Sequence, residues 1–308
     1  MKKNQPTENL SKTNPIVVIH KHDSFYLPYC LYQAKTSNPR SDIILIGDSN
    51  NNHYPSIKHF HISDYSTGIK EFQKVYRHLS TNLPVFELFC FQRWFVLRNF
   101  MQAHQLDTCI HIDSDLMVYS DLSQEHHQFS QYQFTLTRGR SGHCSFFNSR
   151  KSLEKICDFI MFLYEDPSQS KYLQNYYHQV ITEGKVGGVN DMFAFEQYRM
   201  RHPDEIGEMA TIRNGAVYDC NVSRSDGFEI DSRSGTKRIF WKNGQPYGIV
   251  QSSQEQVRFH SLHFQGKAKK QMKRCTKVKP IACKSSLWLG KSFGLLQKVQ
   301  NRVASPTR

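Results

Sequence analysis

Two aspartates that follow an apolar segment are the residues best placed by type and spacing to do chemistry. Residues 109–112 precede Asp113 and Asp115, and Leu, Met and Val come next. This pattern predicts a buried strand with both carboxylates at its end, pointing outward together if the chain bends after Asp113. Such carboxylates repel each other unless a cation, a proton or an arginine compensates them. A divalent ion that also binds phosphate oxygens would suit them, and two solvated aspartates at a strand edge are the plain alternative.

A histidine far downstream offers a further ligand. His263, Gly266 and Lys269 form a His-x-x-Gly-x-x-Lys pattern. Imidazole can join carboxylates on a manganese-like ion. Gly266 would let the backbone approach a phosphate, and Lys267 and Lys269 would neutralise its charge. A solvated basic loop is the alternative interpretation of this segment.

Two charged residues in predicted helices need partners. Arg93 lies within residues 86–104, which are apolar at helical spacing and immediately precede the carboxylate strand. A buried cation needs an anion, so we expect Arg93 to pair either with the aspartates or with a structural carboxylate. Asn190 or Asp191 follows a glycine-rich loop and should cap the next helix, which is the plain explanation of Asp191.

The elements that position these residues alternate between strands and helices. Residues 15–20 and 43–48 read as buried strands, and residues 25–35 between them have helical spacing. This βαβ unit, with its continuously apolar strands, predicts an α/β fold with a mostly parallel sheet covered by helices on both faces. We also expect helices at 72–83, 86–104 and 152–164, strands at 58–62 and 133–137, and antiparallel hairpins within 211–259, one of them pairing 238–242 with 247–252 across Asn243-Gly244.

The same sheet predicts where a ligand would bind. Ligands of parallel sheets lie beyond the carboxyl ends of the strands. That rule places His22, Asp23 and Asp48 on one rim with Asp113 and Asp115. Each residue alone is more often a turn former than a ligand, and their shared rim is what favours a site.

Size and charge limit the classes of protein. The 308 residues, 38% of them hydrophobic, can fill one large domain with an appendage. A net charge of +13 implies attraction for anions such as nucleic acid, acidic lipid headgroups or phosphorylated small molecules. Because the positive charge gathers after Lys267 while the core strands end in acidic residues, no nucleic-acid partner is expected. Eight cysteines without zinc-ligand spacing, and the lack of a signal-like or membrane-spanning apolar run, predict a reduced, cytoplasmic protein.

The two ends of the chain differ from its middle. Residues 1–14 are polar and predicted to be a mobile tail, residues 15–270 form the main domain, and residues 271–308 are a basic amphipathic extension. Within that extension, 287–299 fits a helix lying on an anionic membrane surface or docking back onto the domain. We therefore expect peripheral contact with the inner face of a membrane through residues 285–300, unless the segment docks.

With these motifs in place, residues 15–270 resemble a nucleotide-sugar-dependent glycosyltransferase of the GT-A fold, in particular the glycogenin-like group (family 8). Residues 112–122 look like the Asp-x-Asp strand of that fold, including its trailing Asp-Leu. Residues 263–269 are similar to the C-terminal His-x-x-Gly-x-x-Lys of those enzymes, although Lys270-Gln271 stands where Pro-Trp often follows.

The resemblance implies a hexosyltransferase that moves a sugar from a nucleoside-diphosphate sugar, UDP-sugar first, to a saccharide or lipid-linked acceptor. A role in bacterial surface-polysaccharide synthesis fits the compact cytoplasmic form and the basic tail expected above. Asp113, Asp115 and His263 would hold Mn²⁺ or Mg²⁺. Asp191 would be the general base of an inverting enzyme, or would position substrate in a retaining one. The residues implied to bind nucleotide or donor are His22, Asp23, Asp48, Arg93, Ser114, Asn148, Gly266, Lys267 and Lys269.

Other functions remain open at this point. A metal-dependent nucleotidylyltransferase or phosphoryl-transfer enzyme would share the acidic strand end, but the segment 21–25 is not the glycine-rich loop that usually follows its first strand. A basic nucleic-acid-binding protein would place basic and aromatic residues together on one face. A non-catalytic scaffold is less favoured, because the carboxylates, arginine, histidine and lysines are all present.

Overall fold

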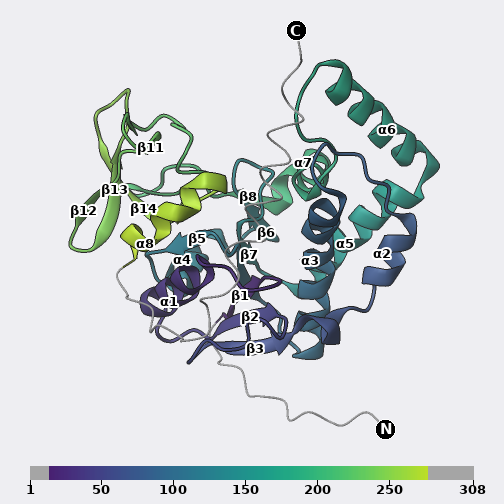
Figure 1. Cartoon of the computed structure of the whole chain (residues 1–308), viewed down its shortest axis with the longest axis horizontal. Helices are drawn as coiled ribbons and strands as arrows, with labels where there is room; N and C mark the ends of the chain where they lie inside the picture. Colours follow the sequence, from purple (N-terminus) through teal and green to yellow (C-terminus); the bar gives the residue numbers. More distant parts are fainter. Residues whose placement is uncertain (1–13, 277–308) are drawn as a thin grey trace.

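Four short strands from the first half of the chain form the centre of the computed structural model, which describes residues 14–276 (Figure 1). β1 (Ile16–Ile19) pairs in parallel with β2 (Ile43–Gly47) on one side and with β4 (Cys109–Ile112) on the other. β3 (Lys58–His61) extends the sheet beyond β2, also in parallel. The predicted βαβ unit is confirmed.

Alternation along these strands explains why they are apolar throughout. Ile16 and Val18 point into one hydrophobic core, whereas Val17 and Ile19 point into the other. The first core is shared with α1 (Leu27–Ser37) and a second sheet, and the other is shared with the helices on the opposite face. A sheet covered on both faces needs apolar side chains at every position, so the predicted α/β fold is confirmed.

The second half of the main sheet contains the one reversed strand among those described. β7 (Cys144–Phe147) runs antiparallel to β4 and to β6 (Phe134–Leu136), and β8 (Ile206–Glu208) pairs in parallel with β6. The strand order is β3-β2-β1-β4-β7-β6-β8. Because Ile112 lies opposite Cys144 and Cys109 opposite Phe147, the residues after β7 lie at the far end of the sheet from Asp113.

Helices cover the second face on the right of Figure 1. The predicted helix at 72–83 is wrong in extent, because α2 ends at Val75 and the chain is not helical again until Pro84. A proline disfavours helical backbone in the residue before it, and Ser80 forms a β-bridge with Gly188. The helix at 167–182 was not predicted, although Leu173, Tyr176 and Val180 recur at helical spacing, with Leu173 and Val180 buried and Tyr176 packed against the core. The helices here are α2 (Ile69–Val75), α3 (Pro84–Ala103), α5 (Arg150–Glu165), α6 (Pro167–Thr182) and α7 (Asp191–Arg201).

A second sheet brings the C-terminal part of the domain to the first. β14 (Gln256–His263) runs antiparallel to β5 (Leu116–Val118), with His263 opposite Leu116. The predicted hairpin across Asn243-Gly244 is confirmed, with its second strand beginning at Gln245. This register is what carries His263 to the turn between β4 and β5. The other strands of this sheet are β9 (Ala216–Tyr218), β12 (Phe240–Lys242) and β13 (Gln245–Ile249).

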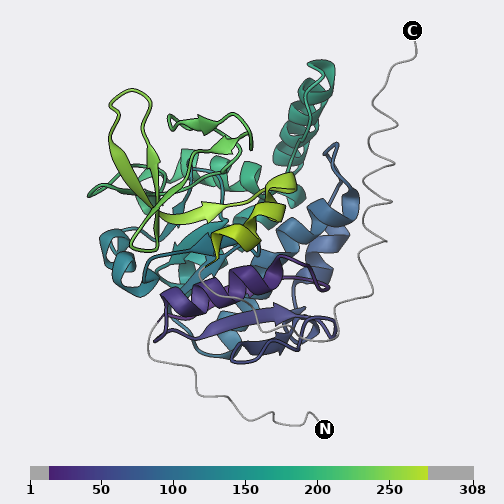
Figure 2. The same cartoon turned by 60° about the vertical axis from the view of Figure 1, so that its left-hand side comes forward.

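The C-terminal turns of the described chain lie beside α1 (Figure 2). Met272 is fully buried in the same core as α1, so the packed domain continues past the boundary predicted at residue 270. Residues 1–13 of the tail predicted at 1–14, and the amphipathic segment 287–299, lie outside the described residues. The remaining short elements are η1 (Ile62–Tyr65), α4 (Leu122–Glu125), η2 (His126–Phe129), η3 (Pro203–Glu205), β10 (Ile230–Asp231), β11 (Thr236–Lys237), η4 (Gly266–Gln271) and α8 (Met272–Cys275).

The structure bears on two predictions about the chain's environment. The seven cysteines between residues 14 and 276 are free thiols, and four of them are buried, as the sequence indicated. Within the same range, no helix has the combination of length and apolar character needed to span a bilayer.

Gly188, in the loop before α7, forms a β-bridge with Ser80, in the loop before α3, and should not tolerate a side chain. Its φ of +148° is a conformation that only glycine adopts readily, and an added Cβ would lie 2.3 Å from the carbonyl oxygen of Leu79. We expect Gly188→Ala to lower the free energy of unfolding by more than about 1–3 kcal/mol, because a clash adds to the backbone strain. Gly184→Ala is the control, since its φ of +62° is also strained but an added Cβ meets nothing within 4 Å. Equal losses in urea denaturation would contradict the role of the bridge.

Candidate active site

The candidate site lies where the strand order of the main sheet reverses. β1 stands between β2 and β4, and ligands of such sheets bind in the crevice beyond the carboxyl ends at this point. The chain turns sharply there, with the N–H of Leu116 donating to the carbonyl of Asp113 at 3.0 Å. Asp113 receives support from the main sheet, because its N–H donates to the carbonyl of His143 at 2.8 Å. The carbonyl of Asp115 accepts from Phe264 at 2.9 Å, on the side of the second sheet.

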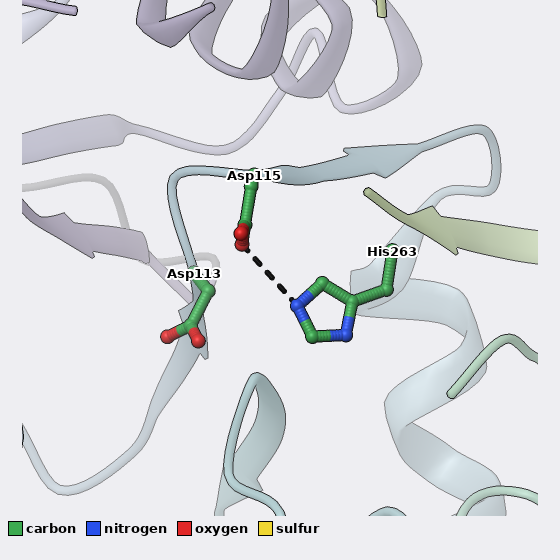
Figure 3. A group of neighbouring side chains, drawn as sticks. All are labelled: Asp113, Asp115 and His263. Carbon is green, nitrogen blue, oxygen red and sulfur yellow. Dashed lines mark ion pairs between the residues drawn. The ribbon is translucent and has the colours of Figure 1, made fainter. Parts of the chain in front are cut away.

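The turn brings together three predicted metal ligands (Figure 3). Asp113, Asp115 and His263 each offer a ligand atom, and these atoms all lie within 4.8 Å of one another. His263 Nε2 lies 3.2 Å from Asp115 Oδ1. Two carboxylates and an imidazole at this spacing suit a divalent cation of the Mn²⁺ or Mg²⁺ type.

Arg93 is the cation that compensates the carboxylates on the other side. Its guanidinium contacts Asp113 Oδ1 at 2.5 Å and Asp191 Oδ2 at 2.6 Å. Trp94 Nε1 donates to the same oxygen of Asp191 at 3.0 Å. The expectation that Arg93 has an anionic partner is confirmed, and it has two. Asn190 caps α7 by accepting from the N–H of Phe193 at 2.8 Å, which leaves Asp191 to hold Arg93.

These contacts set the charges of the cluster. Burial raises the pKa of Asp113, but Arg93 and His111 outweigh it and hold that pKa well below its usual range. Burial likewise opposes ionisation of Asp115, whose pKa is nevertheless lowered by His263 and Lys269. Burial lowers the pKa of His263, and Asp115 more than reverses this effect, so the pKa is raised. The cluster is therefore built to keep both aspartates ionised.

Lys269 connects the carboxylate cluster with the residues that follow β1. Its amine lies 3.1 Å from Asp115 Oδ2 and 4.7 Å from the centre of the Tyr26 ring. The Tyr26 ring meets His20 edge-on, with ring centres 5.9 Å apart. Burial, followed by the charge of Lys269, lowers the pKa of His20 to about 4, so this imidazole is neutral at physiological pH.

The loops after β1 and β2 form a neighbouring cluster on the same rim. Asp48 Oδ2 accepts from the N–H of His22 at 2.7 Å, which holds His22 at a φ of 63°. Asp23 accepts a hydrogen bond from Tyr54 and lies 3.6 Å from His53 Nε2. His22, Asp23 and Asp48 are thus brought together as the rim argument predicted, beside two aromatic rings.

The structure contradicts the prediction made for Asn148. It follows β7, whose reversed direction carries it to the opposite end of the sheet from Asp113. Its side-chain amide donates to the carbonyls of Phe129 and Tyr132, both at 2.7 Å, and its oxygen contacts His126. These bonds fix a local turn, so the predicted contact between Asn148 and a donor sugar is wrong.

The other predicted donor-binding residues lie around the cluster. Ser114 stands half-buried in the turn between the two aspartates. Gly266 has a φ of +55°, and an added Cβ there would meet nothing within 4 Å, so the backbone is open to a ligand. Lys267 is exposed next to it.

Several residues of the site were missed from the sequence. His111 Nε2 lies 3.2 Å from Asp113 Oδ1, and its position two residues earlier on the same strand face was a usable signal. His143 stacks on His263 with ring centres 4.0 Å apart. It lies in the glycine-rich loop segment before β7, and no local pattern indicated its partner.

Comparisons with known proteins concern the fold. Mouse xyloside xylosyltransferase 1 aligns with a TM-score of 0.50 at 10% identity, over 70% of this chain and 90% of that one. A glycosyltransferase involved in the glycosylation of the major capsid of PBCV-1 aligns with a TM-score of 0.37 at 10% identity, over 84% of this chain and 99% of that one. No family model matches the sequence. No curated protein matches it either. The first likeness confirms the predicted GT-A-type fold.

Removing Arg93 should leave the partly buried Asp113 and the buried Asp191 without their shared countercharge. We expect Arg93→Leu to lower the free energy of unfolding by about 3–5 kcal/mol at neutral pH. Because the depressed pKa of Asp113 contributes stability only above the ordinary range of a carboxyl, the deficit should shrink as pH falls through the acidic range. Urea denaturation with a chelator present measures both effects.

Arg238→Leu provides the matched control for that experiment. Arg238 pairs with Glu229 at 3.2 Å, but its side chain is 64% exposed. An exposed ion pair contributes about 0–1 kcal/mol. A loss for Arg93→Leu no larger than that of Arg238→Leu would show that Arg93 does not hold the cluster together.

Proposed function

We propose that this protein is a metal-dependent glycosyltransferase that uses a nucleoside-diphosphate sugar as donor. The observation that carries the proposal is the convergence of Asp113, Asp115 and His263 at the crevice where the strand order reverses. Two cations, Arg93 and Lys269, stand on either side of these ligands. The fold shared with a xylosyltransferase supports the same interpretation.

Asp113, Asp115 and His263 would hold Mn²⁺ or Mg²⁺. When bound, such an ion acts as a Lewis acid that offsets the negative charge on the diphosphate leaving group. The donor set fits this ion, because the Nδ1 of His263 lies 2.8 Å from the carbonyl of Cys220 and its Nε2 faces the carboxylates (Figure 3). An imidazole held through one nitrogen presents the other as a ligand.

The basic residues after β14 would receive the phosphates. Lys269 already lies on the cluster, and Lys267 is exposed nearby on the same short helical segment. The open backbone at Gly266 leaves room for phosphate oxygens to approach. Fixed positive groups aimed at charge that grows in the transition state supply the electrostatic part of catalysis.

The cluster formed by His22, Asp23 and Asp48 would bind the nucleoside, with Ser114 between it and the phosphates. Polar groups there could bind a ribose and a base edge, and the rings of His53 and Tyr54, 4.5 Å apart, offer a surface for stacking. A uracil base is our first candidate, since the resemblance to the glycogenin-like group (family 8) favours UDP-sugars.

Asp191 would lie on the acceptor side as a positioning residue. It is buried, and its carboxylate is already engaged by Arg93, Trp94 and the N–H of Met192. A carboxylate bound in this way is poorly placed to remove a proton from a hydroxyl. We therefore favour Asp191 as the group that fixes Arg93 beside the substrate over its role as a general base.

The acceptor would be a saccharide or a lipid-linked saccharide. Two loops joined by hydrogen bonds between Thr81 and Gly187 lead into α3 and α7, the helices that carry Arg93 and Asp191. Apolar side chains near this junction are strongly exposed, with Val85 in the first turn of α3 at 82% and Val186 in the second loop at 86%. Such side chains beside the acceptor region favour an acceptor with an apolar part, as in bacterial surface-polysaccharide synthesis at the cytoplasmic face of a membrane.

The proposal is tested by the effect of a nucleotide on thermal stability. A ligand that binds the folded protein alone raises its melting temperature by mass action. We expect UDP to raise the melting temperature with Mn²⁺ present and much less with a chelator. Asp115→Asn should abolish the metal-dependent part, because one ligand oxygen becomes an uncharged amide.

Asp121→Asn is the matched control, since Asp121 caps α4 and pairs with Arg40 away from the cluster, and asparagine also caps helices well. It should keep the full response to UDP and Mn²⁺. A response to UDP that is the same in Asp115→Asn and the parent protein would refute the metal role. Stabilisation by nucleoside triphosphates alone would point to a nucleotidylyltransferase.

The predicted contact with an anionic membrane through residues 285–300 is a separate proposal. Ending the chain after residue 276 removes this basic segment and keeps every described residue. We expect the truncated protein to sediment less with liposomes that contain anionic lipid, and the difference to fade at high salt, because such attraction is screened. Liposomes of neutral lipid are the control. Equal sedimentation of the two proteins with anionic liposomes would rule out the segment as the contact.

A further inference from the structure

One short segment of the chain holds three of the four polar groups of His263, and only Nε2 is left to face Asp115. The carboxylate of Asp219 accepts from the His263 N–H at 3.0 Å, and the N–H of Val222 donates to the His263 carbonyl at 2.9 Å. The carbonyl of Cys220 lies 2.8 Å from His263 Nδ1. The orientation of the imidazole is therefore decided by residues 219–222.

That segment is in turn fastened by a buried lysine. The Lys237 amine contacts Asp219 Oδ1 at 2.7 Å, the carbonyl of Asn221 at 2.8 Å and Asp226 Oδ2 at 2.8 Å. The N–H of Lys237 also donates to the carbonyl of Val222 at 2.6 Å. An ammonium group has three N–H donors, and here all three have partners. Asp219 and Asn221 lie within residues 219–222, and Asp226 follows shortly after them.

Stability alone does not explain a charge in this place. The Lys237 side chain is 1% exposed and that of Asp219 is 0% exposed. Taking both charges out of water is so unfavourable that replacing a buried ion pair with apolar residues is often neutral or stabilising. A buried pair can instead specify one arrangement of the chain around it, and here that chain surrounds His263.

His143 extends the same arrangement. It stacks on His263, with ring centres 4.0 Å apart and planes inclined by 20°. Its Nε2 lies 3.1 Å from the backbone carbonyl of Asp219. Residues 219–222, which Lys237 holds in place, therefore contact His263 both directly and through the ring of His143.

The hydrogen bond to Cys220 selects a tautomer. A carbonyl oxygen only accepts, so Nδ1 of His263 carries a hydrogen, and in the neutral ring Nε2 then holds the lone pair. The protonated ring carries a second hydrogen on Nε2, which donates to Asp115. Figure 3 shows the ring with Nε2 directed at Asp115 and its other nitrogen turned away. This is the tautomer that can ligate a cation shared with Asp113 and Asp115.

We propose that Lys237 is a positioning residue that fixes residues 219–222 and thereby holds His263 in the Nδ1–H tautomer, facing the two aspartates. Its value for catalysis rests on the proposed metal-dependent function, whereas the positioning itself does not. Among the described contacts, Lys237 touches none of Asp113, Asp115 and His263, so its effect would be transmitted through Asp219 and the backbone.

The test compares the parent protein with Lys237→Met. In ¹⁵N-labelled protein at alkaline pH, above the raised pKa of His263, the imidazole nitrogen shifts report which nitrogen carries the hydrogen. His263→Ala assigns the signals. We expect a single Nδ1–H form in the parent and a mixture of tautomers in the variant. Mn²⁺ affinity, measured from the free-ion signal in electron paramagnetic resonance, should fall about 10–100-fold, as for other residues that orient metal ligands.

A second variant guards against simple misfolding. Lys237→Met leaves Asp219 buried and unpaired, whereas Lys237→Met combined with Asp219→Asn leaves only Asp226, which still pairs with Arg138 at 2.7 Å. The double variant should fold and still show the mixed tautomers. Lys58→Met is the control, because Lys58 pairs with Asp42 at 3.1 Å on the far side of β2, and it should change neither measurement.

The outcomes separate this proposal from the proposed function. A folded variant that keeps the single tautomer and the Mn²⁺ affinity of the parent would overturn the positioning role. So would a parent protein whose His263 carries its hydrogen on Nε2. Mixed tautomers in the variant with no Mn²⁺ binding by the parent would support the positioning and refute the metal-dependent function.

Discussion

Mutual repulsion among three carboxylates is the constraint on which the rest of the structure depends. Asp113 and Asp191 share the guanidinium of Arg93, and Asp115 is held by His263 and Lys269. Like charges this close repel one another unless cations compensate them. The elements that supply these cations, α3, β14 and η4, come from distant parts of the chain, so folding and charge balance are achieved together.

The two sheets meet at this charge cluster. β4 belongs to the main sheet and β5 to the second, and the turn between them carries Asp113 and Asp115 from one to the other. Since His263 ends β14, which pairs with β5, the distance between the carboxylates and the imidazole depends on that pairing. A shift of one residue in this register would turn His263 to the opposite face. The apolar core beneath both sheets therefore determines the geometry of the site.

The sequence was most informative where a side chain's role follows from its own strand. Continuous apolar runs identified β1, β2 and β4, and their ends located Asp48 and Asp113. The prediction for Asn148 was wrong because the position of this residue depends on the direction of β7. That direction is set by pairing with β4 and not by local residues. The role of Lys237 was not predicted for a similar reason. Nothing in the sequence of a short polar hairpin indicates that its lysine will be buried against Asp219.

The charges at the site also bear on why a divalent cation is required by the proposed function. Three carboxylates face two permanent cations, Arg93 and Lys269, and His263 must be neutral to ligate a metal ion through Nε2, so the cluster in its ligating form carries a net charge of about −1 by the ordinary charges of these groups. The chain's overall +13 cannot correct this, because charges on exposed residues are screened beyond about 8 Å in physiological salt. A diphosphate would be repelled by such a cluster. A divalent ion bound by Asp113, Asp115 and His263 reverses the sign of the local charge, and only then can the diphosphate of a sugar donor bind beside the aspartates.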